Sequence, residues 1–418
     1  MASVFGFARR NWQLFNPSQV SKSAEPLRFG ILGAANIAPQ AFIGPAGSHP
    51  DVVVQTVAAR DLEKAKAYAQ KHGILEASQS YQDILDDPNI DCVYIPLPNG
   101  FHFEWALRAL KAGKHVLLEK PSANNAREAE ILFNSPFLDK PKAPILLEAA
   151  HYVFHPAWTA FFSQITPAEV ASAKAVLWVP GWLFADDNIR FRYDLGGGAL
   201  MDLGAYSASI LSRIFGGLAE ECEECTVKAI PEEPRCDHLF KARYRFPNGG
   251  WGEMEGDIKA PFDRISPNIF VEHKPVVVPG TDVGIDVPRG QEVVRTRKVN
   301  YTNFMQPTFY HSIQVDDEFA IRNIGDTSGQ AIKKWTDSKT IKAYTFHEAG
   351  INQPGETHWS SYRYQLETFV NRVRGQETKQ WVDGVDSITT MKMIVMAYTA
   401  ANLPLRPTSA YTPTDGTI

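Results

Sequence analysis

The sequence predicts an α/β protein in which a parallel sheet comes first and an α+β domain with a large, mostly antiparallel open sheet follows. Between residues 27 and 147, short apolar runs alternate with amphipathic helical segments, as in a parallel sheet with helices on both faces. After about residue 156, strand-like runs follow one another without helices, and Asn248-Gly249 between two of them is a hairpin signal. A chain of 418 residues is long enough for two such domains.

The strands and helices of the first half are predicted from apolar runs and from the residues that begin and end helices. Asp61 is a suitable N-cap for the helix that follows the second strand, and Gly73 stands where that helix should end. A later helix carries apolar residues at i, i+3, i+4 and i+7 from Phe103, and Gly113 closes it. The expected strands are 27–32, 52–58, 92–95, 115–118 and 145–147.

The second half is expected to be strand-rich until it returns to helix. One terminal helix carries an apolar face from Tyr362 and ends at Gly375, and a second one covers about 388–398. The stretch 261–337, rich in prolines, glycines and polar turns, has the least regular pattern. The expected strands are 174–179, 225–230, 238–246, 250–255 and 291–299.

These patterns divide the chain into an N-terminal arm (1–26), a first domain (27–150) and a second domain (151–418), whose last helices (about 360–405) pack back toward the first. The net charge of −5 argues against a nucleic-acid partner. No apolar run is long enough for a membrane span. Only four cysteines indicate a reducing compartment, so we expect a cytoplasmic protein. A mitochondrial presequence is the alternative, because residues 1–24 carry Arg9, Arg10 and Lys22 but no acid.

A small-residue turn follows the first strand, with the sequence Gly33-Ala34-Ala35-Asn36-Ile37-Ala38. It is a G-x-A-x-x-A version of the dinucleotide fingerprint, in which small residues allow a tight turn and a close approach of the backbone to a pyrophosphate. The free N–H groups at the helix N-terminus favour the anion. We therefore predict a Rossmann domain in which Gly33, Ala35, Asn36 and Ile37 hold the cofactor, with Ala35 pushing the phosphates slightly outward.

The end of the second strand bears on the choice between NADP and NAD. Sites for NAD usually place a carboxylate there for the ribose 2′-hydroxyl, but this chain has Ala59 followed by Arg60. An arginine can pair with a 2′-phosphate and stack on adenine. Asp61 comes one position late and is explained by helix capping. Arg60 therefore favours NADP, with NAD as the alternative.

Several later segments resemble the glucose-fructose oxidoreductase / inositol dehydrogenase / rhizopine catabolism (Gfo/Idh/MocA) family. The triplet Glu119-Lys120-Pro121 after the fourth strand is the most specific mark. Further segments that carry the resemblance are 98–102, 112–116, 196–206, 364–367 and 386–387. It covers about residues 27–405.

The resemblance implies roles for individual residues. Lys120 is the expected catalytic lysine near the nicotinamide, and Asp202 and Tyr206 are expected to face the substrate. Many relatives have histidine at the position of Tyr206, and tyrosine is more like the dihydrodiol dehydrogenase, D-xylose dehydrogenase and glucose-fructose oxidoreductase branch. The resemblance also implies a homodimer through the open face of the second sheet. Cofactor contacts are expected from Pro98, Asn99, His102, Glu119 and Lys120.

The expected chemistry is coherent in physical terms. A tyrosine with a pKa of about 10 is a poor base at neutral pH, and a nearby lysine ammonium would lower that pKa and stabilise a developing alkoxide. Asp202 and Tyr206 stand at i and i+4, so one helix would present both on one face. Gly196, Gly197 and Gly198 would start that helix and could approach ligand closely.

The substrate side departs from the family pattern. Relatives often carry an arginine or lysine where this chain has Val153, whereas His151 and His155 are extra. Candidate substrate residues are therefore His151, His155, Trp182 and Arg190. No metal site is expected, because Cys225 and His238, in the group of Cys222, Cys225, Cys236 and His238, fall within predicted strands and a Cys-x-His spacing is unusual.

Together these patterns predict an enzyme that moves hydride between NADP(H) and a secondary or anomeric alcohol of a small polyhydroxylated molecule, with D-xylose as the first choice. One alternative is a dehydrogenase of a dihydrodiol or a secondary-metabolite ketone. The other is a nucleotide-binding regulator without catalysis. An intact Glu119-Lys120-Pro121 together with Tyr206 argues against the regulator.

Overall fold

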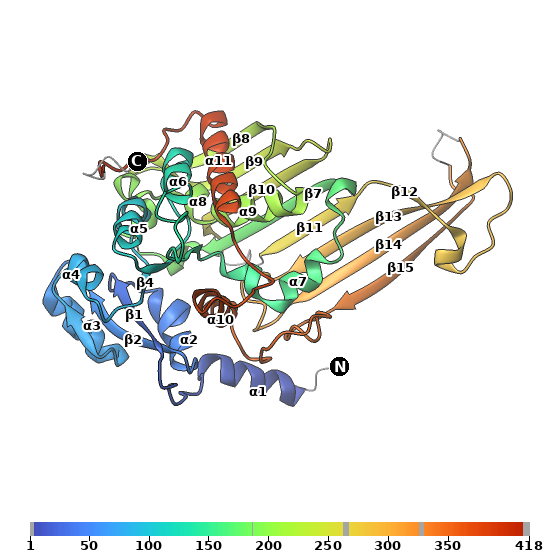
Figure 1. Cartoon of the computed structure of the whole chain (residues 1–418). Helices are drawn as coiled ribbons and strands as arrows, with labels where there is room; N and C mark the ends of the chain where they lie inside the picture. Colours follow the sequence, from blue (N-terminus) through green and yellow to red (C-terminus); the bar gives the residue numbers. More distant parts are fainter. Residues whose placement is uncertain (1–3, 186, 262–266, 326–329, 413–418) are drawn as a thin grey trace.

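The computed structural model describes residues 4–185, 187–261, 267–325 and 330–412 and contains two sheets with helices around them (Figure 1). The first sheet is parallel with the order β3-β2-β1-β4-β5-β6. Because β1 lies between β2 and β4, the strand order reverses there, and ligands bind at such a switch point in open α/β sheets. Its strands are β1 Leu27–Leu32, β2 Val52–Ala58, β3 Glu76–Ser78, β4 Cys92–Ile95, β5 His115–Leu118 and β6 Leu146–Glu148.

The five predicted strands of this sheet are present, and the structure adds β3, which has three residues and no clear sequence pattern. The predicted N-cap and helix end are also present. Asp61 accepts a hydrogen bond from the Glu63 amide (2.8 Å), and Gly73 has a φ of 66°. The helix expected after the glycine turn is irregular, because two prolines and two glycines interrupt it. The helices are η1 Pro39–Ile43 (a π-helical turn), α2 Gly44–Gly47, α3 Leu62–His72, α4 Tyr81–Asp86, α5 His102–Lys111 and α6 Ala126–Phe133.

The second sheet has nine strands and is mostly antiparallel, with one parallel pair between β7 and β10. The predicted fold class is confirmed, and the stretch 261–337, whose sequence pattern is the least regular, contains the predicted strand 291–299 together with further strands. Long strands there alternate charged residues, and cross-strand ion pairs such as Arg297–Asp317 (2.8 Å) satisfy them. The strands are β7 Val170–Pro180, β8 Glu221–Ile230, β9 Glu233–Arg245, β10 Trp251–Ala260, β11 Asn268–His273, β12 Val276–Val278, β13 Gln291–Thr302, β14 Ser312–Asn323 and β15 Lys333–Ile341.

The two C-terminal helices pack back onto the first half, as the sequence predicts (Figure 1). Helix α10 (Ser361–Val373) lies against η1 and α2, and its Phe369 ring is 5.9 Å from that of Phe29. Helix α11 (Gly384–Ala400) packs between α6 and α9 (Gly204–Phe215). We keep 27–150 and 151–418 as the proposed domains. The other helices of the second half are α7 Pro156–Phe162 and α8 Ala199–Asp202.

The N-terminal arm contains helix α1 (Val4–Phe15), which docks on the second half. The buried Arg10 donates from Nε to the carbonyl oxygen of Thr308 (3.0 Å), and its guanidinium lies 3.7 Å from the centroid of the Tyr344 ring. This part of the arm is therefore an ordered element. Within the described ranges, no helix has the length and apolar character needed to cross a membrane.

Candidate active site

An ion triad joins the two halves of the chain at the carboxyl end of the parallel sheet. Lys120, in the turn after β5, donates from Nζ to Asp202 Oδ1 (2.6 Å) and to the Asp202 carbonyl oxygen (2.9 Å). Arg190 Nε donates to the other carboxylate oxygen of Asp202 (2.6 Å). Burial raises the pKa of Asp202, but the charges and hydrogen bonds of Arg190 and Lys120 outweigh it and hold this pKa below its ordinary value. Asp202 is therefore an ionised anchor for both cations.

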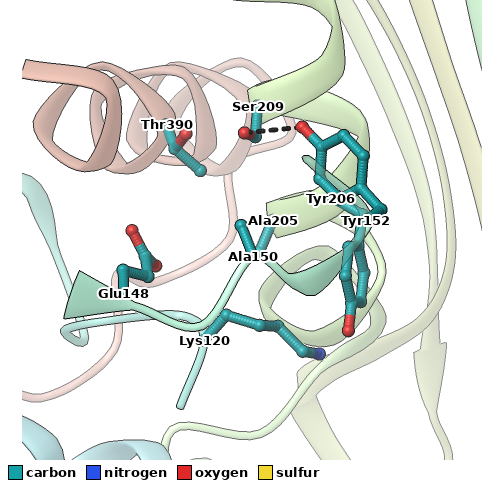
Figure 2. A pocket seen from close by; sticks show the side chains of 8 residues that line it. All are labelled: Lys120, Glu148, Ala150, Tyr152, Ala205, Tyr206, Ser209 and Thr390. Atoms are coloured by element: carbon teal, nitrogen blue, oxygen red, sulfur yellow. Dashed lines mark hydrogen bonds between the residues drawn. The ribbon is translucent and has the colours of Figure 1, made fainter. Parts of the chain in front are cut away.

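Tyr206 lies beside this triad, and the Lys120 ammonium is 4.5 Å from the centroid of its ring (Figure 2). Burial raises the pKa of Tyr206 well above its ordinary value, and the neighbouring Tyr362, Glu119 and Asp202 act in the same direction. The expected net lowering of this pKa is therefore wrong, because the effect of burial outweighs that of the nearby positive charge of Arg190. Tyr206 keeps its proton, which suits a donor better than a base.

The expected single helix from Asp202 to Tyr206 is also interrupted. Asp202 ends α8 and Tyr206 belongs to α9, and Leu203 separates the two helices. Both side chains nevertheless meet Lys120, because α8 leads directly into α9.

His151 brings a neutral polar group to the same cluster. Its ring is 5.6 Å from that of Tyr206 and 4.1 Å from that of Tyr362, measured between centroids. Its Nδ1 lies 2.8 Å from the hydroxyl oxygen of Ser361, whereas Nε2 is buried and has no hydrogen-bond partner among the described residues. Burial lowers the pKa of His151 to about 3, with the Lys120 charge adding to the effect. The imidazole is therefore neutral, with one nitrogen left for another molecule.

Tyr362 is the site residue that sequence reasoning missed. It occupies an apolar position in α10, and helical periodicity predicts only that such a position is buried. Burial raises the pKa of Tyr362, and the charges of Glu119 and Asp202 add to the rise, which shows how close this tyrosine lies to the triad. Only the long-range packing of α10 brings it there.

The turn after β1 has the features of a pyrophosphate site. Gly33 has a φ of 115°, where a side chain would be strained. Asn36 and Ile37 are exposed, and within the described chain neither of their amides donates a hydrogen bond. The Ala35 carbonyl oxygen accepts from the Tyr68 hydroxyl (2.8 Å), which fixes the turn. The residues present therefore fit the anionic part of a dinucleotide.

Other predicted cofactor residues have roles within the protein. Both ring nitrogens of His102 lie 2.7 Å from carbonyl oxygens, those of Pro121 and Leu97, so neither nitrogen is left for a cofactor. His102 instead positions the Lys120-Pro121 turn. Glu119 accepts from the Tyr94 hydroxyl (2.7 Å). The Asn99 amide donates to the Gly196 carbonyl oxygen (2.9 Å). Pro98 precedes Asn99 at the end of the β4 loop, and Arg60 is exposed after β2, where the sequence places it.

Of the remaining substrate candidates, Arg190 belongs to the site around Lys120, whereas His155 has its contacts elsewhere and Trp182 is mostly exposed. Arg190 belongs to the triad, and its guanidinium also lies 4.4 Å from the centroid of the Phe184 ring. His155 caps α7 by accepting from the Ala157 amide (3.1 Å), and its ring neighbours are His311 and Tyr364. Its contacts therefore lie away from Lys120. Trp182 has 68% of its side chain exposed, in the 3₁₀ turn 181–183.

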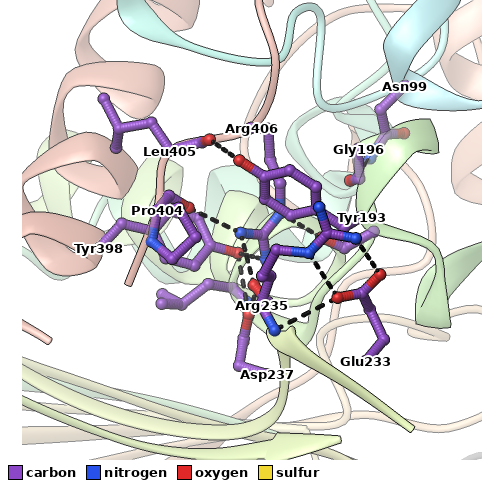
Figure 3. A network of polar contacts seen from close by, with 12 residues as sticks. Asn99, Tyr193, Gly196, Glu233, Arg235, Asp237, Tyr398, Pro404, Leu405 and Arg406 are labelled. Carbon is purple, nitrogen blue, oxygen red and sulfur yellow. Dashed lines mark hydrogen bonds and ion pairs between the residues drawn. The ribbon is translucent and has the colours of Figure 1, made fainter. Parts of the chain in front are cut away.

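The three glycines before α8 approach protein groups, not an open ligand space as expected (Figure 3). A Cβ on Gly196 would lie 2.3 Å from the Asn124 side-chain oxygen, and one on Gly197 would meet the Arg190 carbonyl oxygen at 2.6 Å. A Cβ on Gly198 would lie 2.3 Å from an Arg406 nitrogen. The triple glycine therefore lets the backbone fit tightly between its neighbours.

The cysteines lie in the second sheet. Cys225 and Cys236 are buried in β8 and β9, and Cys222 is partly exposed in β8. Across the described ranges, no group of three or more His, Cys, Asp or Glu side chains is arranged to hold a metal ion.

Comparison with known proteins places this site in a family. The family profile described as "Oxidoreductase family, NAD-binding Rossmann fold" matches residues 27–135, and the profile "GFO/IDH/MocA C-terminal domain" matches 169–279. Over 228 residues the chain is 36% identical to "Uncharacterized oxidoreductase ORF334" of Rhizobium meliloti, which covers 53% of this chain and 66% of that protein. Over 193 residues it is 37% identical to "D-xylose 1-dehydrogenase (NADP(+)) 2" of Haloferax volcanii, covering 46% and 58%. The matched segments therefore span less than two thirds of these curated relatives.

Solved structures support the same fold over nearly the whole length. The crystal structure of KijD10, a 3-ketoreductase from Actinomadura kijaniata in complex with NADP and TDP-benzene, matches with a TM-score of 0.64 and 21% identity. The match covers 90% of this chain and 98% of that chain, and at such identity it shows the fold alone. The two family profiles together cover more than half of the chain and include the turn after β1, the Lys120 triplet and strands β7 to β12 of the second sheet, so this chain belongs to the Gfo/Idh/MocA oxidoreductase family.

Proposed function

We propose that this chain is an NADP-dependent oxidoreductase that interconverts a secondary or anomeric alcohol and its carbonyl on a small polyhydroxylated substrate, such as the monosaccharide D-xylose. The observation that carries the proposal is the meeting of Lys120, Asp202 and Tyr206 at the carboxyl end of a parallel sheet of Rossmann order. That is the edge where dinucleotides bind in this fold. The relative from Haloferax volcanii, named as an NADP-dependent D-xylose dehydrogenase, supports the cofactor and the substrate class.

The residues that would hold the cofactor are the turn from Gly33 to Ile37 and Arg60. The unpaired amides of Asn36 and Ile37 suit the pyrophosphate, and the exposed Arg60 guanidinium suits a 2′-phosphate. When bound, the nicotinamide accepts or supplies the hydride. Lys120 follows the end of β5, close enough to the switch point to act on the substrate oxygen.

The side chains of this site would handle the proton and the charge of the reaction. In the reducing direction, a carbonyl oxygen near Lys120 and Tyr206 gains negative charge, which the Lys120 ammonium stabilises. Tyr206, held protonated by its surroundings, donates its proton to that oxygen. Asp202 keeps the ammonium in place. Tyr206 then regains a proton from water. In the oxidising direction Tyr206 would first give its proton to water, and the phenolate would accept the proton of the alcohol.

The free nitrogen of His151 favours a hydroxylated substrate. A buried polar atom without a partner costs free energy that a ligand can recover. A hydroxyl can both donate and accept, so it pairs with His151 Nε2 in either tautomer of the imidazole. A carbon carrying a hydroxyl next to the reacting carbon meets this need, as in a sugar.

A dihydrodiol or a secondary-metabolite ketone is the second candidate substrate. The observation in its favour is the pair of aromatic rings, Tyr206 and Tyr362, next to His151. These faces would pack on a planar or apolar ring. A sugar or a dihydrodiol offers a neighbouring hydroxyl to His151, whereas an apolar ketone does not, so the substrate profile of a His151 variant separates the ketone from the hydroxylated substrates.

The test is fluorescence titration with NADPH and NADH, followed by turnover with sugars, dihydrodiols and ketones at the nicotinamide absorbance. We expect tighter binding of NADPH and turnover of a polyol. The Lys120→Ala variant should still bind NADPH and lose turnover, whereas a regulator would bind NADPH without turnover in either form. If neither nucleotide binds, the proposal is wrong. We also expect a homodimer, which light scattering after gel filtration measures.

A further inference from the structure

We propose that residues 403–409, here called the C-terminal strap, are a positioning element that sets the Lys120–Asp202 pair by gripping both halves of the chain. The strap follows α11 and has no regular secondary structure. It lies at or beyond the end of the family resemblance in the sequence. Its contacts run to the turn before Asp202 on one side and to the segment after Lys120 on the other.

On the Asp202 side, the contact is the Arg406 guanidinium, which is fully buried (Figure 3). Arg406 donates to the Gly197 carbonyl oxygen through Nε, and through Nη2 to Asp237 Oδ1 (3.0 Å) and the Tyr398 hydroxyl (2.7 Å). The other carboxylate oxygen of Asp237 accepts from the Leu200 amide (2.7 Å), in the first turn of α8. Helix α8 ends two residues later at Asp202, so the strap fixes the helix that carries the anchor of Lys120.

On the Lys120 side, the contacts fall four to eight residues after the lysine. The side-chain amide of Asn124 donates to the Pro407 carbonyl oxygen (2.8 Å), and the backbone N–H of Ser409 donates to Glu128 Oε1 (2.6 Å). The Asn125 amide donates to the Thr408 hydroxyl (3.1 Å). Glu128 also accepts a hydrogen bond from the backbone N–H of Asn124 (2.9 Å), which closes the turn before α6. The strap therefore holds the segment that begins at the Lys120-Pro121 turn.

These two sets of contacts have different characters. Arg406 and Asp237 form a buried ion pair, and removing either partner leaves a buried charge without compensation. The contacts at 407–409 are partly buried hydrogen bonds to another part of the chain, and no side chain of the hydrophobic core clusters takes part in them. Geometry at Lys120 and Asp202 is expected to respond to both sets, because a shift of about 1 Å at reacting groups can cost about 100-fold in rate.

The inference rests on the proposed function for its kinetic readout, so the experiment includes a readout independent of activity. The variant Arg406→Met can simply fail to fold, because it leaves the buried carboxylate of Asp237 without its ion-pair partner. The double variant Asn124→Ala/Ser409→Pro keeps the Arg406–Asp237 pair. It removes two hydrogen bonds between the strap and the first half, those from the Asn124 side chain to Pro407 and from the Ser409 N–H to Glu128. The matched control is Lys392→Ala, which breaks the Lys392–Glu130 pair (2.7 Å) between α11 and α6 without touching the strap.

Acetylation of lysines with a limiting reagent, followed by mass spectrometry, reports on the Lys120–Asp202 pair. In the double variant we expect Lys120 to react several-fold faster than in wild type, with exposed Lys66 and the thermal midpoint unchanged. We expect kcat to fall about tenfold while the Kd for NADPH stays the same. The control should match wild type in every measurement.

Two results would overturn the strap proposal. Unchanged Lys120 acetylation and unchanged kcat in the double variant would show that the strap does not set the pair. Faster acetylation of all lysines with a lower thermal midpoint would show a purely structural role. If wild type turns over no substrate, the proposed function fails, and the acetylation rates still decide the role of the strap.

Discussion

Lys120 and Asp202 stand 82 residues apart in the sequence, and their side chains meet at 2.6 Å between the two halves of the chain. Lys120 donates to two oxygens of Asp202, and among the described residues no hydrogen bond joins it to the Tyr206 hydroxyl. The ammonium is held by Asp202 and lies over the Tyr206 ring. Lysine is thus an electrostatic partner for the substrate oxygen, and tyrosine is a proton donor.

The Asp202→Asn substitution tests the anchor. The amide can still accept a hydrogen bond from Lys120 but no longer compensates the charges of the two cations, so the ammonium is less firmly held in place. We expect kcat/KM to fall about 10- to 100-fold, in line with the loss of a charge-assisted hydrogen bond. The Kd for NADPH should stay within about twofold of wild type, a difference of less than about 0.5 kcal/mol. Steady-state kinetics and a nucleotide titration measure both. An unchanged kcat/KM would remove Asp202 from the machinery.

The Tyr206→Phe substitution tests the proton donor. We expect kcat for carbonyl reduction to fall by about 10²- to 10⁴-fold, the usual contribution of general acid catalysis. Because the surroundings raise the pKa of Tyr206, the wild-type reduction rate should show no loss assigned to this hydroxyl between pH 7 and about pH 9, where an unperturbed tyrosine is also protonated. The pH profile of kcat/KM in wild type and variant checks the point. A wild-type decline as the pH rises through 7–8 that Tyr206→Phe abolishes would mean that Tyr206 loses its proton in this range, which contradicts a raised pKa of Tyr206.

The acid limb of stability gives a test of His151. The folded-state pKa of this residue is lowered to about 3, whereas an unfolded histidine titrates near about 6.5. Between these values the unfolded chain binds a proton that the folded chain does not. The free energy of unfolding therefore falls with falling pH in this window, by at most roughly 1.4 kcal/mol per pH unit for one such group. His151→Phe should reduce this slope, measured by urea unfolding at pH 4.5–7.5.

The same variant also reports on the substrate. Phenylalanine keeps the contacts with Tyr206 and Tyr362 but offers no hydrogen bond to a hydroxyl. We expect the KM for a polyol to rise about tenfold or more, consistent with the loss of one hydrogen bond to a buried group, while that for an apolar ketone changes little. The His347→Phe variant, at an exposed histidine, is the control for both measurements. A rise in KM that is equal for both substrates would contradict a hydrogen bond between His151 and a substrate hydroxyl.

Local signals predicted much of the fold because their physics is local. The turn at Gly33, the cap at Asp61 and the helix end at Gly73 depend on a few neighbouring residues, and the structure has all three. The strands β14 and β15 escaped prediction because their charged residues look like loop residues. Partners on neighbouring strands satisfy some of these charges, as Lys298 of β13 does for Glu318 of β14 (2.7 Å).

The site was only partly predictable for the same reason. Resemblance supplied Lys120, Asp202 and Tyr206, but no sequence pattern says that Asp202 pairs with both Lys120 and Arg190. Tyr362 looks like a core residue, and His102 looks like a ligand until its two carbonyl partners are seen. Such assignments depend on contacts between residues far apart in the chain, which periodicity and capping do not describe.

The glycine before α8 offers a stability test with an internal control. Gly198 has a φ of 122°, and a Cβ there would meet Arg406, Asp237 and Tyr398 at 2.3–2.8 Å, all within a buried network. Gly73 also has a positive φ (66°), but a Cβ there meets nothing within 4 Å. We expect Gly198→Ala to cost more than about 3 kcal/mol and Gly73→Ala about 1 kcal/mol. Urea unfolding of the two variants measures the difference, and equal costs would contradict the tight approach of Arg406.

Cofactor choice depends on Arg60, and its replacement gives the last test. The side chain is exposed at the end of β2, and a 2′-phosphate bound there would form a charge-assisted hydrogen bond worth about 1.5–3 kcal/mol. We therefore expect Arg60→Ala to raise the Kd for NADPH about 10- to 100-fold and to leave that for NADH nearly unchanged. Lys64→Ala, at an exposed cation on the neighbouring helix α3, should change neither value and controls for the general loss of positive charge. If Arg60→Ala weakens both nucleotides equally, the guanidinium contacts a part that they share, such as adenine, and the preference for NADP must come from elsewhere.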